Sequence, residues 1–178
     1  QNTHGGIANY LLATKQIFPI LTTDKMLFQF QFTFDMSIPE IFLPLISGAS
    51  VIIAKPGGQR DSGYLVDLIV EKGITESLFV PSMLQVLLEE QDIARCHSLK
   101  RITVGGEKLP VEAVKRFYQC LPEAKLISIY GPSEISHACT YWETDPKHEY
   151  VSVPIGHIIP NNKFYVLEGA HANIKNDC

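Results

Sequence analysis

The chain has 178 residues, of which 46% are hydrophobic and 19% charged, a composition typical of one globular domain or a piece of a larger one. Its net charge of −4, without a basic stripe or a polybasic helix, argues against nucleic acid and membrane surfaces as partners. The four cysteines show no CxxC spacing, which indicates reduced thiols in a cytoplasmic protein without a structural zinc site.

Helical and strand-like patterns alternate from the start of the chain. Residues 5–16 repeat apolar side chains at helical spacing, and residues 26–30 are strand-like. A helix is expected over residues 37–46, with Ser37 as a candidate N-cap and Glu40 at the spacing of a capping box. Two prolines within this segment argue against a regular helix throughout.

The middle of the chain continues the alternation. Gly48 is expected to end the preceding helix, and residues 50–54 are interpreted as a β-branched, buried strand. The apolar stretch 37–54 therefore predicts a helix, a turn and a strand, and not a membrane span. Residues 55–63 form a polar, glycine-rich surface loop, and residues 64–72 a helix.

Further short strands and helices complete the pattern. In chain order, we expect a strand at 77–80, a helix opening at Pro81, a strand at 99–104, a helix over 110–120, and strands at 126–129 and 163–167. This order predicts an α/β fold in which right-handed βαβ units surround a largely parallel sheet. In such sheets, ligands bind beyond the carboxyl ends of the strands.

Three of the predicted strands end in distinctive loops. The residues that follow them are 80–82 (VPS), 104–107 (VGGE) and 130–134 (YGPSE). If the three strands are neighbours, these loops converge on one site. The expected convergence favours a shared binding role over three unrelated turns.

The segment from Ser128 to Glu134 (SIYGPSE) carries the most chemistry. Its glycine permits backbone shapes that other residues resist, and its proline fixes φ. The Ser133 hydroxyl could meet a phosphate, and the Glu134 carboxylate could hold a cation. The alternative is a tight turn in which Ser133 is an N-cap and Glu134 a favourable charge in a first helical turn. These residues alone leave both interpretations open.

Several ordered blocks carry a family resemblance. They are residues 34–49 (FDMSIPEIFLPLISGA), similar to FDxSxxEIFxPLxxGA; residues 104–107, similar to a VGGE turn; residues 128–134, similar to NxYGPTE; residues 155–167 (IGHIIPNNKFYVL), similar to IGxPxxNxxxYVLD; and Thr3, His4 and Asn9, similar to the helix start after a phosphate loop. In this order they resemble the adenylation domains of nonribosomal peptide synthetases, within the adenylate-forming superfamily of AMP-binding enzymes.

The resemblance implies that the chain is one part of a larger domain. It matches the large N-terminal domain of an adenylate-forming enzyme, so residues 1–178 are expected to be a partial adenylation domain. The family's phosphate loop is expected just before Gln1. The ribose-binding aspartate, the hinge and the small C-terminal domain with its catalytic lysine are expected after Cys178. We therefore expect no ATP–pyrophosphate exchange from this chain alone.

The resemblance also implies a chemistry. The family uses ATP and Mg²⁺ to convert an amino acid to an aminoacyl-AMP, then transfers the acyl group to a phosphopantetheine thiol on a peptidyl carrier domain. A condensation domain is a further partner in a full synthetase. Because the reaction is mainly positioning and charge neutralisation, the residues that contact phosphate and cation count as catalytic.

The nucleotide residues follow from the matching blocks. Ser133 would contact the α-phosphate and Glu134 would help to hold Mg²⁺, which prefers oxygen ligands. Tyr130 would lie on the adenine ring. Ser128 stands where the family usually has asparagine, which leaves adenine recognition there open. The full set of expected nucleotide-binding residues is Gly105, Gly106, Glu107, Ser128, Tyr130 and Gly131.

The substrate residues are assigned in the same way. Asp35 would pair with the α-ammonium group, because a carboxylate in an apolar segment needs a partner; otherwise it is an N-cap or a surface residue. The remaining side-chain pocket positions are Met36, Pro39, Leu78, Ile102, Val104, Ile129, His137 and Ala138. Nearly all are apolar, which favours an apolar or aromatic amino acid. His137 either bonds a polar group of the substrate or faces solvent.

Two other functions compete with this one. An acyl-CoA synthetase or aryl-acid ligase of the same superfamily would act on acids without an amino group and would not need Asp35. An inactive truncated remnant would have no catalytic role at all.

Overall fold

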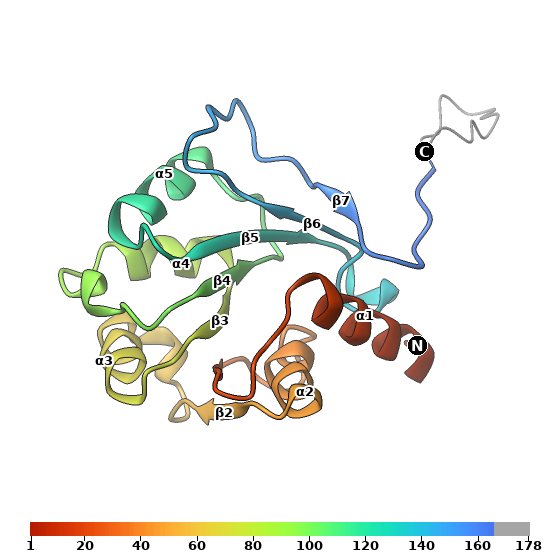
Figure 1. Cartoon of the computed structure of the whole chain (residues 1–178), viewed down its shortest axis with the longest axis horizontal. Coiled ribbons are helices and arrows are strands. Elements are labelled where there is room, and N and C mark those ends of the chain that lie inside the picture. The colour runs from red at the N-terminus through yellow and green to blue at the C-terminus, as the bar shows by residue number, and fades with distance from the viewer. Residues whose placement is uncertain (166–178) are drawn as a thin grey trace.

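The chain folds around one mixed sheet. The computed structural model describes residues 1–165, and within them the strand order is β2-β1-β3-β4-β5-β6-β7 (Figure 1). The first five strands in this order are parallel, and β6 and β7 are antiparallel to their neighbours. The strand bounds are β1 Lys25–Phe28, β2 Ser50–Ile53, β3 Glu76–Phe79, β4 Arg101–Val104, β5 Lys125–Tyr130, β6 Thr140–Glu143 and β7 His157–Ile158.

Helices cover both faces of the sheet. Their bounds are α1 His4–Ile17, α2 Ser37–Ser47, α3 Ser62–Lys72, α4 Pro81–Leu88 and α5 Val111–Cys120, with 3₁₀ turns η1 Gly58–Arg60, η2 Ile93–Arg95 and η3 Ser133–Ile135. Figure 1 shows α3, α4 and α5 grouped on one side of the strands and α1 and α2 on the other. Each face therefore has its own apolar core. The α/β architecture with a largely parallel sheet, predicted from the alternating pattern, is confirmed.

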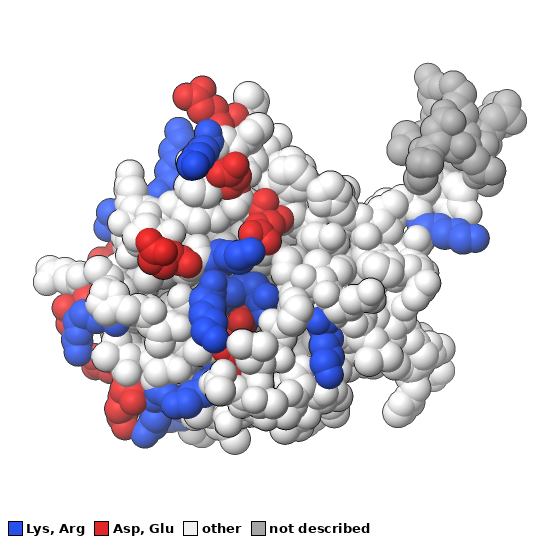
Figure 2. Space-filling model, viewed as in Figure 1, with Lys and Arg blue, Asp and Glu red and all other residues white. Residues whose placement is uncertain are grey.

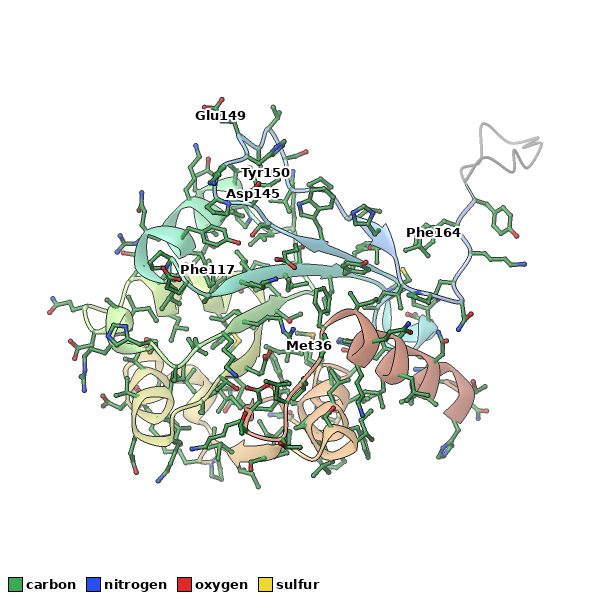
Figure 3. The ribbon with its side chains drawn as sticks, in the orientation of Figure 1. Met36, Phe117, Asp145, Glu149, Tyr150 and Phe164 are labelled. Carbon is green, nitrogen blue, oxygen red and sulfur yellow. The ribbon has the colours of Figure 1, made fainter. Side chains whose placement is uncertain are left out.

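The two cores are separated by the alternation of strand side chains. Ile102 and Val104 of β4 belong to the core under α3, α4 and α5. Leu78 of β3 and Ile129 of β5 belong to the core under α1 and α2. Figure 3 shows Phe117 of α5 and Met36, which precedes α2, on these two different sides. The face on which a strand residue lies thus decides which layer it contacts.

Adjacent strands bring the three predicted loops together. Phe79 pairs with Val104, and Val104 pairs with Ser128, so β3, β4 and β5 end side by side. The carboxyl ends of these parallel strands therefore form one edge, at which ligands bind in α/β sheets. The expected convergence of the loops is confirmed.

Some local expectations are wrong. Residues 50–54 were expected to form a buried strand, but β2 is an edge strand and its Ile53 is 70% exposed. No side chain caps α2: its N-cap is Met36, so the capping box of Ser37 and Glu40 does not form. Ser37 instead donates its hydroxyl to the Phe32 carbonyl at 3.2 Å, because the chain turns sharply before the helix.

The C-terminal part differs from the prediction as well. Residues 163–165 form no strand, and residues 166 and 167 of the predicted last strand lie outside the described residues. Strands β6 and β7 were not predicted. Both are short and only partly buried, so the apolar run that marks a buried strand is missing from them.

The surface carries charges of both signs. In Figure 2, Lys, Arg, Asp and Glu are interspersed on the side of α3, α4 and α5, whereas the visible surface near α1 and β7 is mostly uncharged. A further, largely buried ion pair lies where β3 and β4 begin, with 2.7 Å between Arg101 Nε and Glu76 Oε2. Among the helices of residues 1–165, none has the length and apolar character needed to cross a membrane.

Candidate nucleotide and amino-acid site

The loop after β5 meets the loop before α2 at the carboxyl edge of the sheet. The Ser133 hydroxyl donates a 2.5 Å hydrogen bond to Oδ2 of Asp35, although 98 residues separate the two in sequence. Ser133 lies in η3, a three-residue 3₁₀ turn that has no side-chain cap. The alternative interpretation of Ser133 as the N-cap of a helix is therefore wrong, and its hydroxyl is directed at Asp35.

The environment of Asp35 favours its ionised form. His137 Nδ1 lies 3.8 Å from Oδ1 of Asp35, and the adjacent imidazole is the largest influence that lowers the pKa of this carboxyl. Burial opposes this effect, and the hydrogen bond from Ser133 supports it. The carboxylate is half-buried, with Oδ2 bonded to Ser133 and Oδ1 facing the His137 imidazole. It is therefore an anion at the edge of the sheet.

His137 is buried beside this carboxylate, and so it does not face solvent. It is 4% exposed, its two ring nitrogens have no hydrogen-bond partner, and its ring meets Tyr10 edge to face at 4.8 Å. Its φ of 104° follows Ser136 with a φ of 70°, both in the left-handed region that side chains rarely adopt. This backbone turns the imidazole inward, toward Tyr10 and Asp35.

An apolar cluster lies next to these polar groups. Of the predicted pocket residues, Met36, Leu78, Ile129 and Ala138 belong to the same buried core. Pro39, Leu78 and Ile129 also line one small cavity of about 30 Å³ between the sheet and helices α1 and α2. Five expected pocket positions are thus brought together on one face of the sheet.

Two predicted pocket positions are wrong. Ile102 and Val104 are fully buried in the core on the opposite face, so they cannot line a pocket with Leu78 and Ile129. Thr103 takes the expected place, because it pairs with Leu78 and lines the same cavity. Gly105 also lies on this side, where an added Cβ would come within 2.7 Å of the Ile129 side chain. The period-two alternation of a strand is the signal that could have identified both residues.

The nucleotide residues border a separate cleft. It has a volume of about 410 Å³ and includes the predicted residues Gly106, Glu107, Ser128, Tyr130 and Gly131 in its lining. Tyr130 is 51% exposed, which leaves a ring face open to a planar partner. The far wall is formed by residues 153–155, which the sequence interpretation did not assign to the nucleotide. Gly105 is absent from this lining, and its Cα faces the Ile129 side chain instead.

Two residues of the cleft also hold its walls together. The Glu107 carboxylate accepts hydrogen bonds from the backbone N–H and the hydroxyl of Ser82, each at 3.0 Å, and so joins the loop after β4 to the start of α4. Gly131 approaches the chain at Ala138 so closely that an added Cβ would lie 2.6 Å from the Ala138 Cα. The first contact joins the loops after β3 and β4, and the second fixes the loop after β5 against itself.

Comparison with known proteins identifies the family. The family model described as AMP-binding enzyme matches residues 1–177. The chain belongs to the AMP-binding enzyme family. Its relatives include tyrocidine synthase 3 of Brevibacillus parabrevis, 38% identical over 169 residues that cover 95% of this chain and 3% of that protein. Phosphinothricin tripeptide synthetase PhsB of Streptomyces viridochromogenes is 36% identical over 94% of this chain and 14% of its own length.

Solved structures share the fold of this AMP-binding segment. The Vibrio cholerae adenylation domain AlmE, in complex with glycyl-adenosine-5'-phosphate, superposes with a TM-score of 0.87 at 23% identity, over 97% of this chain and 32% of that chain. The nonribosomal peptide synthetase FmoA3 gives 0.87 at 24% identity, over 94% and 18%. The resemblance inferred from the ordered sequence blocks is confirmed.

The candidate cation ligand is a single carboxylate. Glu134 is exposed in η3, directly after Ser133. Among residues 1–165, no group of three or more His, Cys, Asp or Glu side chains could hold a metal by itself. A single exposed carboxylate fits Mg²⁺, which keeps several waters and binds through one or two carboxylates together with substrate phosphates.

Proposed function

We propose that this segment binds the amino acid and ATP in an enzyme that forms aminoacyl-AMP for nonribosomal peptide synthesis. The relatives that support this are multi-module synthetases of which the chain spans a small share. Residues 1–178 are then a partial adenylation domain. In this assignment the acyl group passes to a phosphopantetheine thiol on a carrier domain, with a condensation domain as a further partner, in the cytoplasm.

The observation that carries the proposal is the position of Asp35. An ionised carboxylate, with one oxygen bonded to Ser133 and the other facing His137 at 3.8 Å, lies beside an apolar cluster at the carboxyl edge of the sheet. A half-buried anion in such a setting is stabilised by a cationic partner. The α-ammonium group of an amino acid supplies that cation, and the neighbouring cluster accommodates its side chain.

The nucleotide half of the proposal uses the cleft around Tyr130. The exposed tyrosine ring stacks on adenine, and the backbone of Gly106 leaves room for the nucleotide close to the main chain. Ser133 places its hydroxyl between the two halves, where the substrate carboxylate meets the α-phosphate. Glu134 holds Mg²⁺, which supplies charge neutralisation at the phosphates when it is bound.

The pocket favours an apolar or aromatic side chain. Four of its members are aliphatic or thioether residues of the buried cluster, Met36, Leu78, Ile129 and Ala138. Thr103 of the cavity lining and the neighbouring His137 are polar groups next to this cluster, and Thr14, Glu76 and Arg101 add polar atoms to the cavity wall. Because leaving a buried polar group without a partner is costly, a polar substrate side chain would bind well only where it reaches one of these polar groups.

The decisive experiment replaces Asp35 in the complete protein that carries this chain. Amino-acid-dependent ATP–pyrophosphate exchange is measured across a panel of amino acids for the wild type, Asp35→Asn and the matched surface control Asp61→Asn. Asp35→Asn should lower kcat/KM for the preferred amino acid by about a hundredfold or more, because it removes one partner of a desolvated charge pair. The control should remain within about twofold of the wild type.

The alternative outcomes are distinct. Full exchange activity in Asp35→Asn would exclude the proposed ammonium contact. Exchange that depends on an aryl or fatty acid and on no amino acid would assign the protein to the acyl-CoA synthetases or aryl-acid ligases. No exchange with any acid in the wild type would favour an inactive remnant.

A further inference from the structure

A buried carboxylate lies outside the residues to which the proposed reaction assigns a contact. Glu40, in the first turn of α2, is fully buried, and its Oε2 accepts hydrogen bonds from the backbone N–H groups of Gln29 and Phe30, both at 3.0 Å. These two N–H groups follow directly after the end of β1 and would otherwise be buried donors without a partner. A single side chain therefore accepts the hydrogen bonds of both backbone N–H groups where the chain leaves the sheet.

The Gln29 side chain adds a second hydrogen bond at the same point. Strands β1 and β3 pair through only one register position, Met26 with Glu76, and then separate. Beyond this, the Gln29 side chain donates from Nε2 to the Leu78 carbonyl at 2.6 Å. The contact bridges the gap between the two strands and ends on a residue of the side-chain pocket.

The loop enclosed by these contacts carries Asp35. Between Phe30 and α2 the chain makes consecutive turns, with hydrogen bonds from Phe34 N to the Gln31 carbonyl at 2.9 Å and from Ile38 N to the Asp35 carbonyl at 3.0 Å. Glu40 closes this loop from its helix side and Gln29 from its strand side. The position of the Asp35 carboxylate therefore depends on both ends of the loop.

We propose that Glu40 and Gln29 act together as positioning residues that hold Asp35 at the place where it meets the substrate ammonium group. This inference rests on the proposed function. It adds two residues that touch neither substrate nor nucleotide and that act through the geometry of the loop.

The state of Glu40 agrees with such a role. Burial raises its pKa to about 8, and its Oε1 has no hydrogen-bond partner. A neutral carboxylic acid can accept both N–H bonds with one oxygen, and it avoids the cost of a buried charge. Glutamine has the same acceptor oxygen and shape, so it is a conservative replacement, whereas alanine removes the acceptor.

The test compares the effects of each variant on amino-acid binding and on ATP binding in the complete protein. KM values for the amino acid and for ATP are measured by pyrophosphate exchange in the wild type, Glu40→Ala, Glu40→Gln and Gln29→Met. The control is Glu112→Ala, which removes an exposed carboxylate from the first turn of α5. Circular dichroism and thermal unfolding report whether each variant folds.

We expect Glu40→Ala and Gln29→Met to raise the amino-acid KM by about tenfold while the ATP KM stays within about twofold. Glu40→Gln and Glu112→Ala should match the wild type for both substrates. Should Glu40→Ala not fold, Gln29→Met decides, because it keeps both hydrogen bonds to Glu40 and releases only the tie to Leu78.

Two results would overturn the inference. One is a folded Gln29→Met variant with an unchanged amino-acid KM. The other is an equal rise of both KM values in a folded Glu40→Ala variant, which would indicate general damage and no specific effect on Asp35. The absence of amino-acid-dependent exchange in the wild type would instead contradict the proposed function.

Discussion

Ser133 Oγ and Asp35 Oδ2 lie 2.5 Å apart and join the two loops to which the proposed function assigns the phosphate and ammonium contacts. The contact connects the end of β5 with the segment before α2, elements at distant places in the sequence. Because each residue has a proposed ligand of its own, the hydrogen bond links the two halves of the candidate site directly. It can be tested without any substrate.

Removing the Ser133 hydroxyl should raise the pKa of Asp35. In the folded chain this pKa is lowered, first by His137 and then, against the effect of burial, by the hydrogen bond from Ser133. A lowered pKa means that Asp35 stabilises the fold above its unfolded pKa and that this contribution is lost as the pH falls. Ser133→Ala should therefore weaken stability near neutral pH by about 1 kcal/mol.

The measurement is an NMR titration of the Asp35 carboxyl carbon in the 178-residue chain. Ser133→Thr is the matched control, since it keeps the hydroxyl and should leave the pKa near that of the wild type. An Asp35 pKa that is the same in Ser133→Ala and in the wild type would contradict this prediction.

Replacing Thr103 should change the amino-acid preference, whereas replacing Ile102 should change only the stability. Thr103 lines the cavity with Leu78, whereas Ile102 is buried in the opposite core. Thr103→Val should change the ranking of amino acids in exchange assays of the complete protein. Ile102→Val should keep the ranking and lower the free energy of unfolding by about 1 kcal/mol. A changed ranking in Ile102→Val alone would reverse the assignment of the two faces.

Gly131→Ala should destabilise the chain. The added Cβ would lie 2.6 Å from the Ala138 Cα and 2.9 Å from the His137 carbonyl oxygen, and backbone atoms cannot rotate away. We expect a loss of roughly 1–3 kcal/mol in thermal or urea unfolding. Gly5→Ala in α1 is the control, because its nearest neighbour would be 3.9 Å away, and it should unfold no earlier than the wild type.

Glu40→Gln should become more stabilising as the pH rises. The pKa of Glu40 in the folded chain is about 8, against an ordinary value of 4.5, because burial disfavours its charged form. Between these two values the folded state binds more protons than the unfolded state, so the wild type loses stability with rising pH. The glutamine variant does not titrate and lacks this loss.

The difference in unfolding free energy between Glu40→Gln and the wild type should therefore grow from about pH 4.5 to about pH 8 and level off above it, reaching a few kcal/mol at most. Urea unfolding across this range measures it. A difference that does not vary with pH would show that Glu40 has an ordinary pKa in the folded chain.

Local sequence patterns were sufficient for the order of the main elements. Periodicity located the five α-helices and the first five strands of the described chain, because each buries one apolar face or run. Strands β6 and β7 are short and only partly buried, so they show no apolar run from which a strand could be predicted. The carboxylate of Glu40 was misread as half of a capping box, since its spacing from Ser37 fits that motif and only the fold shows that it turns back toward Gln29.

The sequence by itself determined the family to which this chain belongs, because the motif blocks that identify it are local and ordered along the chain. Only the tertiary structure decided which of these residues meet. It placed Ser133 against Asp35, put Thr103 and not Ile102 or Val104 at the cavity beside Leu78, and buried His137 beside Tyr10. The physical reason is that contacts across a sheet depend on strand order and on the face each side chain takes, and both are settled by packing between segments that lie far apart in sequence.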